Sequence, residues 1–444
     1  MNKLFSYKNC YCFLLFFSFS SSFSQNQYVT KDSISILINK VSDKALPLLD
    51  RLDYNNQIYA LSQQDSLIDF TLNKYVYLYY KLNDSSNFQK YSNKCLKHSQ
   101  KTKNNKAIAK TLEYKAAFYK RYNTIDSTFY YNHKSFKIYE NIKDSLGAGK
   151  ILMNIAILQK NTHDYTGSKT TSLKSLIFLK TTKNKRRISS IYNNLGIIYT
   201  NLESYDKALE FHNKALVLRS EIADKSIYQI QSLNNIAKVY KDSGENDKAI
   251  EYLEKALLSD SLLYQNLETK AAIIDNLAHA RFKKDSQQEV LAYLLDALAI
   301  RKKINDKNGI IISSLHLAEY YKSKNNTKLA ILYAEQAEQT AIQTKKYRDY
   351  LSSLELIGDL YSGEEAKDKY KRYIVIRDSL DLVARKQKEQ FAFIQLEVEE
   401  KDQLIKEHKQ SNQKKYYLII GLIIIVLIIT IAYFFSRHKR QKQD

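Results

Sequence analysis

The chain has 444 residues and a formal net charge of +22, with only nine glycines, one proline and no tryptophan. So few turn-forming residues favour helices and exclude an all-β fold, which needs many turns marked by Gly and Pro. They also argue against enzymes that hold nucleotides in glycine-rich loops. The basic residues are spread evenly, with no basic stripe and no base-reading motif, so we expect no nucleic-acid partner.

The N-terminus has the features of a secretory signal peptide. Basic residues precede an apolar run at residues 11–19, and small residues flank Ser24. This order predicts cleavage after Ser24, which would remove residues 1–24. An uncleaved membrane anchor is the alternative. A lipoprotein is not expected, because neither Cys10 nor Cys12 follows the small residues that such processing requires.

The middle of the chain repeats itself every 40 or 41 residues. Each clear copy has a large apolar residue followed by Gly or Ala, a tyrosine three residues on, and two small residues seven apart. The two clearest copies are Leu195, Gly196, Tyr199, Ala208 and Ala215, then Ile236, Ala237, Tyr240, Ala249 and Ala256. Weaker copies follow at Leu277, Leu317 and Leu356, and precede at residues 155–156, 116–119 and 76–79, where most of the small residues are missing.

This pattern resembles the tetratricopeptide repeat. The resemblance implies two antiparallel helices per copy, which stack on their neighbours because no single pair buries its own apolar face. We expect about eight copies over residues 65–380, preceded by an N-terminal helical cap at residues 25–64 in which Pro47 starts or kinks a helix. The period exceeds the usual 34 residues, so each copy must have longer helices or a longer linker.

A membrane-spanning helix is predicted at residues 416–435. The stretch contains no charged residue, and fourteen of its residues are Leu, Ile, Val or Phe. At 1.5 Å per residue its length matches a hydrocarbon layer of about 30 Å. The apolar residues favour insertion by about 4 to 8 kcal/mol in total. The basic tail at residues 436–444 is expected in the cytoplasm by the positive-inside rule, and the signal peptide independently places the repeats on the periplasmic side.

A charged helical stalk is predicted between the repeats and the span, at residues 381–415. Its apolar residues recur at heptad-like spacing for about two heptads, which is compatible with a short coiled coil and a homodimer. These residues are Phe391, Ile394, Val398 and Ile405, with Lys401 at the intervening seam position.

The order of signal peptide, external repeats, stalk and single span resembles the input half of bacterial membrane sensors. Such sensors usually continue into a cytoplasmic histidine kinase or helix-turn-helix DNA-binding domain. Here nine residues follow the span, so neither output is expected from this sequence. The resemblance therefore implies an input half without its output domain.

No catalytic residues, metal site or cofactor are predicted. The eight histidines are scattered without ligand spacing. Gly147-Ala148-Gly149-Lys150 lacks the spacing and the hydroxyl residue of a phosphate loop, so we interpret it as a helix start. After signal cleavage Cys95 would stand alone at a position that favours a small residue, which predicts a buried packing thiol.

The candidate binding surface is the inner face of the first helices, because in tetratricopeptide arrays that face forms a groove for extended peptides. Three successive copies place Asn193, Asn234 and Asp275 there, with Lys238 and His279 one turn further on. An amide side chain offers both a donor and an acceptor to a peptide backbone. Asn154, Asn194, Asn235 and Asn276 form a neighbouring ladder, which we interpret as structural.

The sequence therefore predicts an all-α protein: a tetratricopeptide-like solenoid, a long juxtamembrane helix and one C-terminal transmembrane helix. We expect a membrane-anchored module that binds a peptide or protein partner. Two alternatives remain. One is a truncated sensor whose kinase or DNA-binding output is a separate chain, and the other is a cytoplasmic scaffold held by its C-terminal helix.

Overall fold

The computed structural model describes residues 33–62, 64–222, 227–258 and 260–440, and every regular element within these ranges is an α-helix. The all-α fold is therefore confirmed. The described residues fall into two compact units, one ending at Lys388 and the other beginning at Glu389. The predicted signal peptide at residues 1–24 and the last four residues of the predicted tail lie outside the described ranges.

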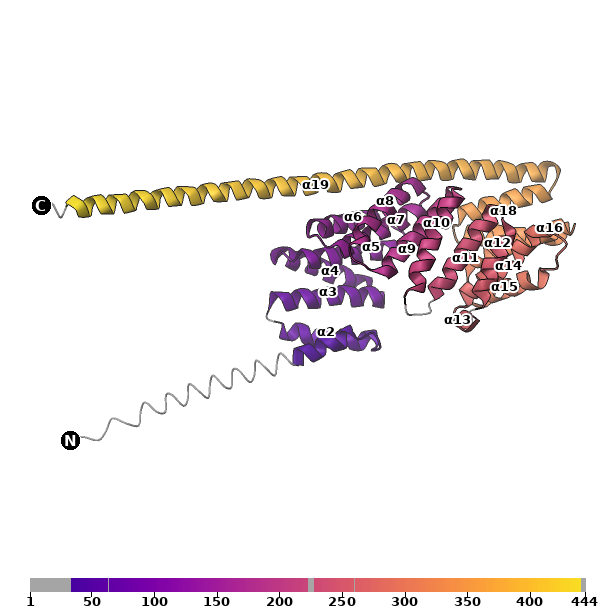
Figure 1. The fold of residues 1–444 in the computed structure, drawn as a ribbon, viewed down its shortest axis with the longest axis horizontal. Helices are drawn as coiled ribbons and strands as arrows, with labels where there is room; N and C mark the ends of the chain where they lie inside the picture. The colour runs from indigo at the N-terminus through magenta and orange to yellow at the C-terminus, as the bar shows by residue number, and fades with distance from the viewer. Residues whose placement is uncertain (1–32, 63, 223–226, 259, 441–444) are drawn as a thin grey trace, which may run out of the picture. The chain divides into compact units, whose positions relative to one another are not determined.

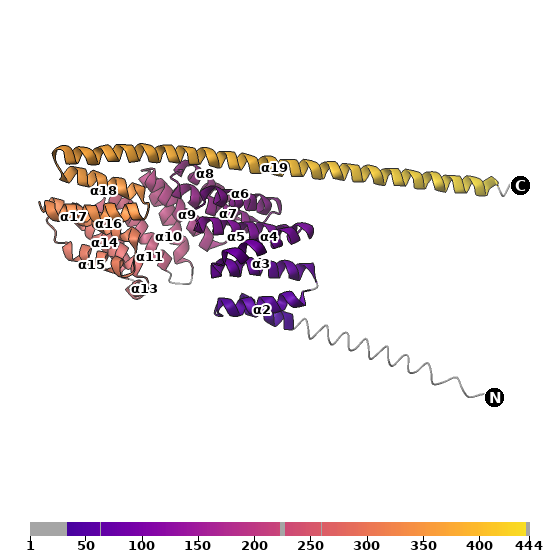
Figure 2. The same ribbon diagram turned by 180° about the vertical axis from the view of Figure 1, so that it is seen from behind.

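The first unit is a succession of helices from α2 to α18, most of them packed against the next in chain order, while α12 packs on α14 past the short α13 (Figures 1 and 2). A helical segment at residues 33–42 precedes them. Their bounds are α2 (Leu48–Leu61), α3 (Asp65–Leu82), α4 (Ser85–Lys101), α5 (Asn105–Arg121), α6 (Ile125–Asn141), α7 (Ser145–Asn161), α8 (Tyr165–Lys180), α9 (Lys185–Asn201), α10 (Tyr205–Ser220), α11 (Ile227–Asp242), α12 (Asn246–Leu257), α13 (Asp260–Gln265), α14 (Leu267–Lys284), α15 (Leu291–Lys303), α16 (Lys307–Ser323), α17 (Thr327–Gln343), α18 (Tyr347–Leu360) and α19 (Gly363–Arg440). Pro47 directly precedes α2, so it starts a helix.

The 40-residue period comes from longer helices and not from longer linkers. Helices α5, α6, α7, α9, α16 and α17 are each 17 residues long, or about 25 Å. Short turns join them, and a residue with left-handed φ recurs every 20 residues from Asn83 to Glu203. The residue after it is often Asp or Asn, whose side chain accepts a hydrogen bond from the first turn of the next helix, as Asp144 does from Gly147 N. Each such cap contributes about 1 kcal/mol, and this one confirms Gly147 as part of a helix start.

The small residues of the repeat pattern let paired helices approach closely. Ala208, Ala215, Ala249 and Ala256 are fully buried, as predicted. At Gly196 an added Cβ would come within 2.6 Å of the His212 ring. Large side chains would therefore force these helices apart.

Serine replaces alanine in the N-terminal repeats, which explains why these copies are hard to detect in the sequence. Ser135 and Ser175 are fully buried at equivalent positions of α6 and α8. Their hydroxyls donate to backbone carbonyls of the preceding helix, Ser135 to Ala109 O at 2.8 Å and Ser175 to Gly149 O at 2.7 Å. The hydroxyl is satisfied in this way, so a small polar residue fills the role of a small apolar one.

The tyrosine of the motif stacks on an aromatic ring twelve residues further along, in the second helix. The ring centroids of Tyr199 and Phe211 are 5.4 Å apart, and the planes differ by 6°. The pairs Tyr79–Tyr91, Tyr119–Tyr131 and Tyr321–Tyr333 repeat this stacking, and the planes of Tyr240 and Tyr252 are tilted by 30°. Aromatic pairs of this kind add about 0.5 to 1.5 kcal/mol each to the burial of their area.

The apolar core runs from one helix pair into the next. One cluster joins Ile230 of α11, Leu253 of α12 and Leu277 of α14. The following cluster joins Phe282 of α14, Leu294 of α15 and Leu317 of α16. A pair cut from its neighbours would expose half of its core, so the stability of the array is shared between adjacent repeats.

The last described helix, α19, is continuous from Gly363 to Arg440, so the predicted limits at residues 380, 415 and 435 coincide with no helix break. Its first turns still belong to the repeats, since Tyr373 and Ile376 pack on the core of α16 to α18. Among the predicted heptad residues, Phe391, Ile394 and Val398 are buried, whereas Ile405 is 54% exposed. By length and composition this helix is able to cross a membrane, with an apolar window of mean hydropathy 2.5.

Candidate peptide-binding surface

The five predicted site residues lie on three successive first helices. Asn193 is on α9, Asn234 and Lys238 are on α11, and Asp275 and His279 are on α14. Residues four apart lie on the same side of a helix, so each pair one turn apart shares a face. The structure places these residues in two kinds of environment: an asparagine ladder between helices, and a buried charged cluster.

The asparagine ladder links neighbouring repeats. Asn235 Nδ2 donates to Asn193 Oδ1 at 2.8 Å, and Asn276 Nδ2 donates to Asn234 Oδ1 at 3.0 Å. The ladder predicted as structural therefore anchors the oxygens of Asn193 and Asn234. Among the described residues neither Asn193 Nδ2 nor Asn234 Nδ2 has an acceptor, and neither nitrogen is buried. Each amide thus keeps a donor that no described residue engages.

Asp275 does not line an open surface, contrary to its predicted place in the groove. Its side chain is fully buried and accepts hydrogen bonds from Arg301 at 3.1 Å, Ser313 at 3.1 Å and His316 at 3.0 Å. Burial raises the pKa of Asp275, but the facing His316 and Arg301 outweigh burial and hold the pKa below its ordinary value. This carboxylate ties α14, α15 and α16 together.

His279 is also buried and is held by the same cluster. Its ring stacks on His316 with centroids 3.7 Å apart, and its Nε2 lies 3.0 Å from Glu319 Oε2. Burial, reinforced by the charge of His316, lowers the pKa of His279 to about 3, so the ring is neutral near pH 7. Lys283 completes the cluster with an ion pair to Glu319 at 2.7 Å. His279 is therefore a buried, neutral side chain that packs between α14 and α16.

Lys238 is the exposed charge of the predicted set. Its side chain is 54% exposed and pairs with Asp242 at 3.4 Å. Burial raises the pKa of Asp349, at the start of α18, and the nearby Lys346 and Lys238 partly oppose this rise. The ammonium group of Lys238 remains accessible to a ligand that lies along α11.

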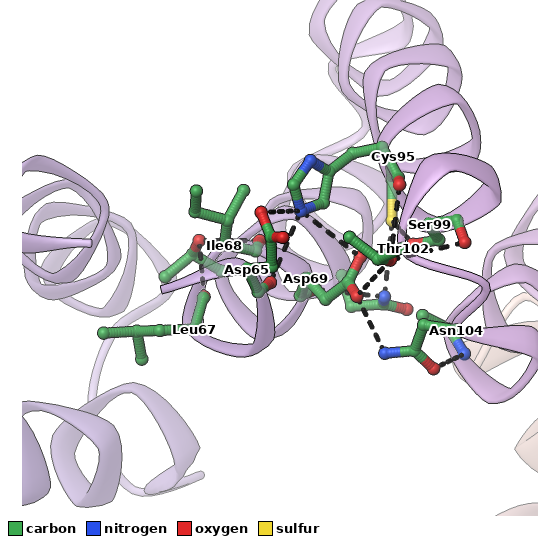
Figure 3. A network of polar contacts seen from close by, with 12 residues as sticks. Asp65, Leu67, Ile68, Asp69, Cys95, Ser99, Thr102 and Asn104 are labelled. Carbon is green, nitrogen blue, oxygen red and sulfur yellow. Dashed lines mark hydrogen bonds and ion pairs between the residues drawn. The ribbon is translucent and has the colours of Figure 1, made fainter. Parts of the chain in front are cut away.

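A second buried carboxylate, Asp69 on α3, has a structural role. Ser99 donates to it at 2.6 Å, Thr102 at 3.0 Å and Asn104 at 2.8 Å, and Figure 3 shows these side chains converging on it. Cys95 lies in the same region, fully buried and free, and it accepts a hydrogen bond from Thr111 at 3.1 Å. Burial raises the pKa of its thiol. The prediction of a buried packing thiol is confirmed.

Two buried arginines of the second helices were missed by the sequence reasoning, as was Arg51 on α2. Arg219 and Arg301 occupy equivalent positions at the ends of α10 and α15, and both are more than nine-tenths buried. Each is four residues after a buried alanine, Ala215 or Ala297. A charged residue at a fixed offset from the small residue in two repeats was a detectable signal.

Comparison with known proteins identifies the repeat. Residues 187–257 match the family model of the tetratricopeptide repeat. No curated protein sequence matches the chain. The apo form of the quorum sensor NprR from B. thuringiensis superposes with a TM-score of 0.58 at 16% identity, over 79% of this chain and 99% of that one. A Rap protein complexed with competence and sporulation factor gives 0.54 at 12% identity, over 79% and 99%.

The fold is a tetratricopeptide-like helical-repeat solenoid, and the family match covers residues 187–257 of it. Its best-matching segment, residues 187–257, spans α9 to α12 and so contains Asn193, Asn234 and Lys238. At these low identities the solved structures establish the fold, and the role of the surface must be argued from its own chemistry.

Proposed function

We propose that the chain binds a peptide or an extended protein segment along the inner face of α9, α11 and α14. The observation that carries this proposal is the pair of amide nitrogens at Asn193 and Asn234. Their oxygens are fixed by the neighbouring repeat, so the donors are held in place before a ligand arrives. A preordered donor loses little conformational entropy when it binds a peptide carbonyl.

The comparison structures support this proposal. NprR in complex with its cognate peptide NprX superposes with a TM-score of 0.51 at 17% identity, over 78% of this chain and 99% of that one. The Rap structure described above is likewise a complex, with competence and sporulation factor. Two proteins of this fold thus bind such partners, and an array of this type suits an elongated ligand.

The proposed ligand contacts are fewer than the five predicted residues. Asn193, Asn234 and the exposed Lys238 would contact the ligand directly. Asp275 and His279 would support the surface indirectly, because both are buried in the cluster that holds α14 against α16. We therefore propose that these two residues set the spacing of the surface and do not contact the ligand.

The test uses the full chain in lipid nanodiscs and a random peptide display library, followed by fluorescence anisotropy with the selected peptides. The variant Asn234→Asp keeps the oxygen that accepts from Asn276 and removes the free donor. We expect about tenfold weaker peptide binding, since a lost hydrogen bond contributes about 1 kcal/mol and the new charge repels peptide carbonyls. Asn213→Asp, on the second helix α10, is the matched control and should bind as the wild type does. Equal affinities for Asn234→Asp and the wild type would contradict the proposal.

We further propose that residues 416–435 of α19 span a membrane, with the repeats outside the cytoplasm and the tail at residues 436–444 inside. The apolar window of α19 and the basic residues of the tail support this orientation. Protease added to spheroplasts that carry a C-terminally tagged chain should digest the repeats and leave a small tagged fragment. A fully protected array would favour the cytoplasmic scaffold. An output domain encoded beside this chain would favour the sensor whose output is a separate protein.

A further inference from the structure

A polar hollow of about 270 Å³ lies among the start of α9, the end of α10 and the start of α11. Three of its lining residues are Arg186, Arg187 and Arg219, and none is acidic. Ser190 also lines the hollow, and it lies one helical turn before Asn193 on α9. The hollow is therefore next to the asparagine ladder.

Arg219 is the buried member of the hollow. It is 7% exposed, and its Nη1 donates to Tyr228 O at 2.7 Å and to Ser232 Oγ at 2.6 Å. No carboxylate of the described residues pairs with it. A buried guanidinium without a counter-charge is costly, and burial lowers the pKa of Arg219 to about 10.

The equivalent arginine two repeats later, Arg301, has a carboxylate partner. Arg301 Nη1 makes the same two kinds of contact, to Gly309 O at 2.8 Å and to Ser313 Oγ at 2.6 Å. It also donates to the Asp275 carboxylate at 3.1 Å. At the position of Asp275, helix α9 carries the neutral Asn193. Among the described residues, Arg301 therefore pairs with a carboxylate and Arg219 does not.

Among the described residues, no side chain forms an ion pair with Arg186 or Arg187. Glu221, which precedes the lining residue Ile222, forms an ion pair with Lys185 at 3.0 Å. Three guanidinium groups around one hollow match a carboxylate, which accepts paired hydrogen bonds from arginine.

We propose that the hollow formed by Arg186, Arg187 and Arg219 binds a carboxylate of the peptide that lies along Asn193 and Asn234. This inference rests on the proposed function and specifies its ligand: a peptide with an acidic side chain or a free C-terminus placed at α9. The incoming carboxylate supplies for Arg219 the counter-charge that Asp275 supplies for Arg301.

The first test uses the full chain in nanodiscs and peptides selected as described above. Each peptide is made as the free acid, as the C-terminal amide, and with Asp and Glu replaced by Asn and Gln. We expect the wild type to bind at least one neutralised form with an affinity at least about tenfold lower than that of the free acid. The form that loses affinity identifies the carboxylate that is recognised. The double variant Arg186→Gln/Arg187→Gln should lose this discrimination, whereas Lys214→Gln/Lys255→Gln, on the second helices, should retain it. Equal binding of all three peptide forms by the wild type would overturn the inference while leaving the proposed function intact.

A second variant tests the empty counter-ion position directly. Asn193→Asp recreates the pairing of Asp275 with Arg301, so its melting temperature without ligand should exceed that of the wild type. An unchanged or lower melting temperature would overturn the role assigned to Arg219. If no peptide binds the wild type, the proposed function fails. The hollow is then tested with glutarate as the probe: a melting temperature raised in the wild type but not in Arg186→Gln/Arg187→Gln supports a carboxylate site, and equal shifts overturn it.

Discussion

Replacing Asp275 with asparagine should destabilise the array locally and strongly. The change keeps the size of the side chain and removes the charge that faces Arg301, which is 3% exposed. Breaking a buried ion pair by removing one partner costs about 3 to 5 kcal/mol, because the other charge stays buried and uncompensated. The Nε of Arg301 is already buried without a hydrogen-bond partner, so loss of the Asp275 charge would leave a second part of this guanidinium uncompensated.

The loss should be confined to part of the chain, because repeat arrays couple mainly to their neighbours. Hydrogen exchange measured by mass spectrometry on the full chain resolves this. A loss of 3 kcal/mol corresponds to exchange about a hundredfold faster in α14 to α16. Proteolytic fragments of the chain that cover α5 to α7 should exchange at the wild-type rate.

Two further variants decide whether the charge is the cause. Asp247→Asn removes a carboxylate that is 78% exposed, so it should change stability by less than about 0.5 kcal/mol. Adding Arg301→Leu to Asp275→Asn removes the orphaned cation, so the double variant should be more stable than the sum of the single changes predicts. Unchanged exchange in α14 to α16 of Asp275→Asn, or strictly additive effects, would refute the reasoning.

Three further predictions follow from the packed interior. Burial lowers the pKa of His212 to about 4 and that of His279 to about 3. Both rings are thus neutral in the fold, so the stability they support is complete above pH 6.5 and falls as the unfolded chain takes up protons below it. Each should contribute a loss of about 2 kcal/mol between pH 7 and pH 5 in urea titrations, and His212→Gln should remove about half of this dependence, leaving the part that His279 contributes. Gly149→Ala should destabilise by about 1 to 3 kcal/mol, because its Cβ would come within 2.6 Å of Leu179, whereas an unchanged urea midpoint would show that the helices separate freely. Cys95 should react with a thiol reagent only after denaturation, since it is fully buried, and rapid labelling of the native chain would contradict this burial.

Much of the fold could be predicted from the sequence, because the spacing of the repeat identifies which residues pack against one another. Leu195, Gly196 and Tyr199 recur with their equivalents at a fixed spacing, and each falls where the tetratricopeptide pattern places it. The N-terminal copies were harder to identify because Ser135 and Ser175 replace alanine. Their hydroxyls are compatible with the core only because a carbonyl of the neighbouring helix is in reach, and a linear sequence does not show that contact.

For the candidate site, too, the sequence determined some features and the tertiary structure decided others. The sequence by itself determined that Asn193, Asn234 and Asp275 occupy equivalent positions, because register along a helix depends only on spacing. Only the tertiary structure decided that the two asparagines keep a free donor while Asp275 is buried against Arg301. The physical reason is that a side chain's partner lies on another helix, 26 residues away for this pair, and depends on how closely the helices pack. Equivalent positions in a repeat can therefore have different environments, one with a donor that no described residue engages and the other buried against its neighbours.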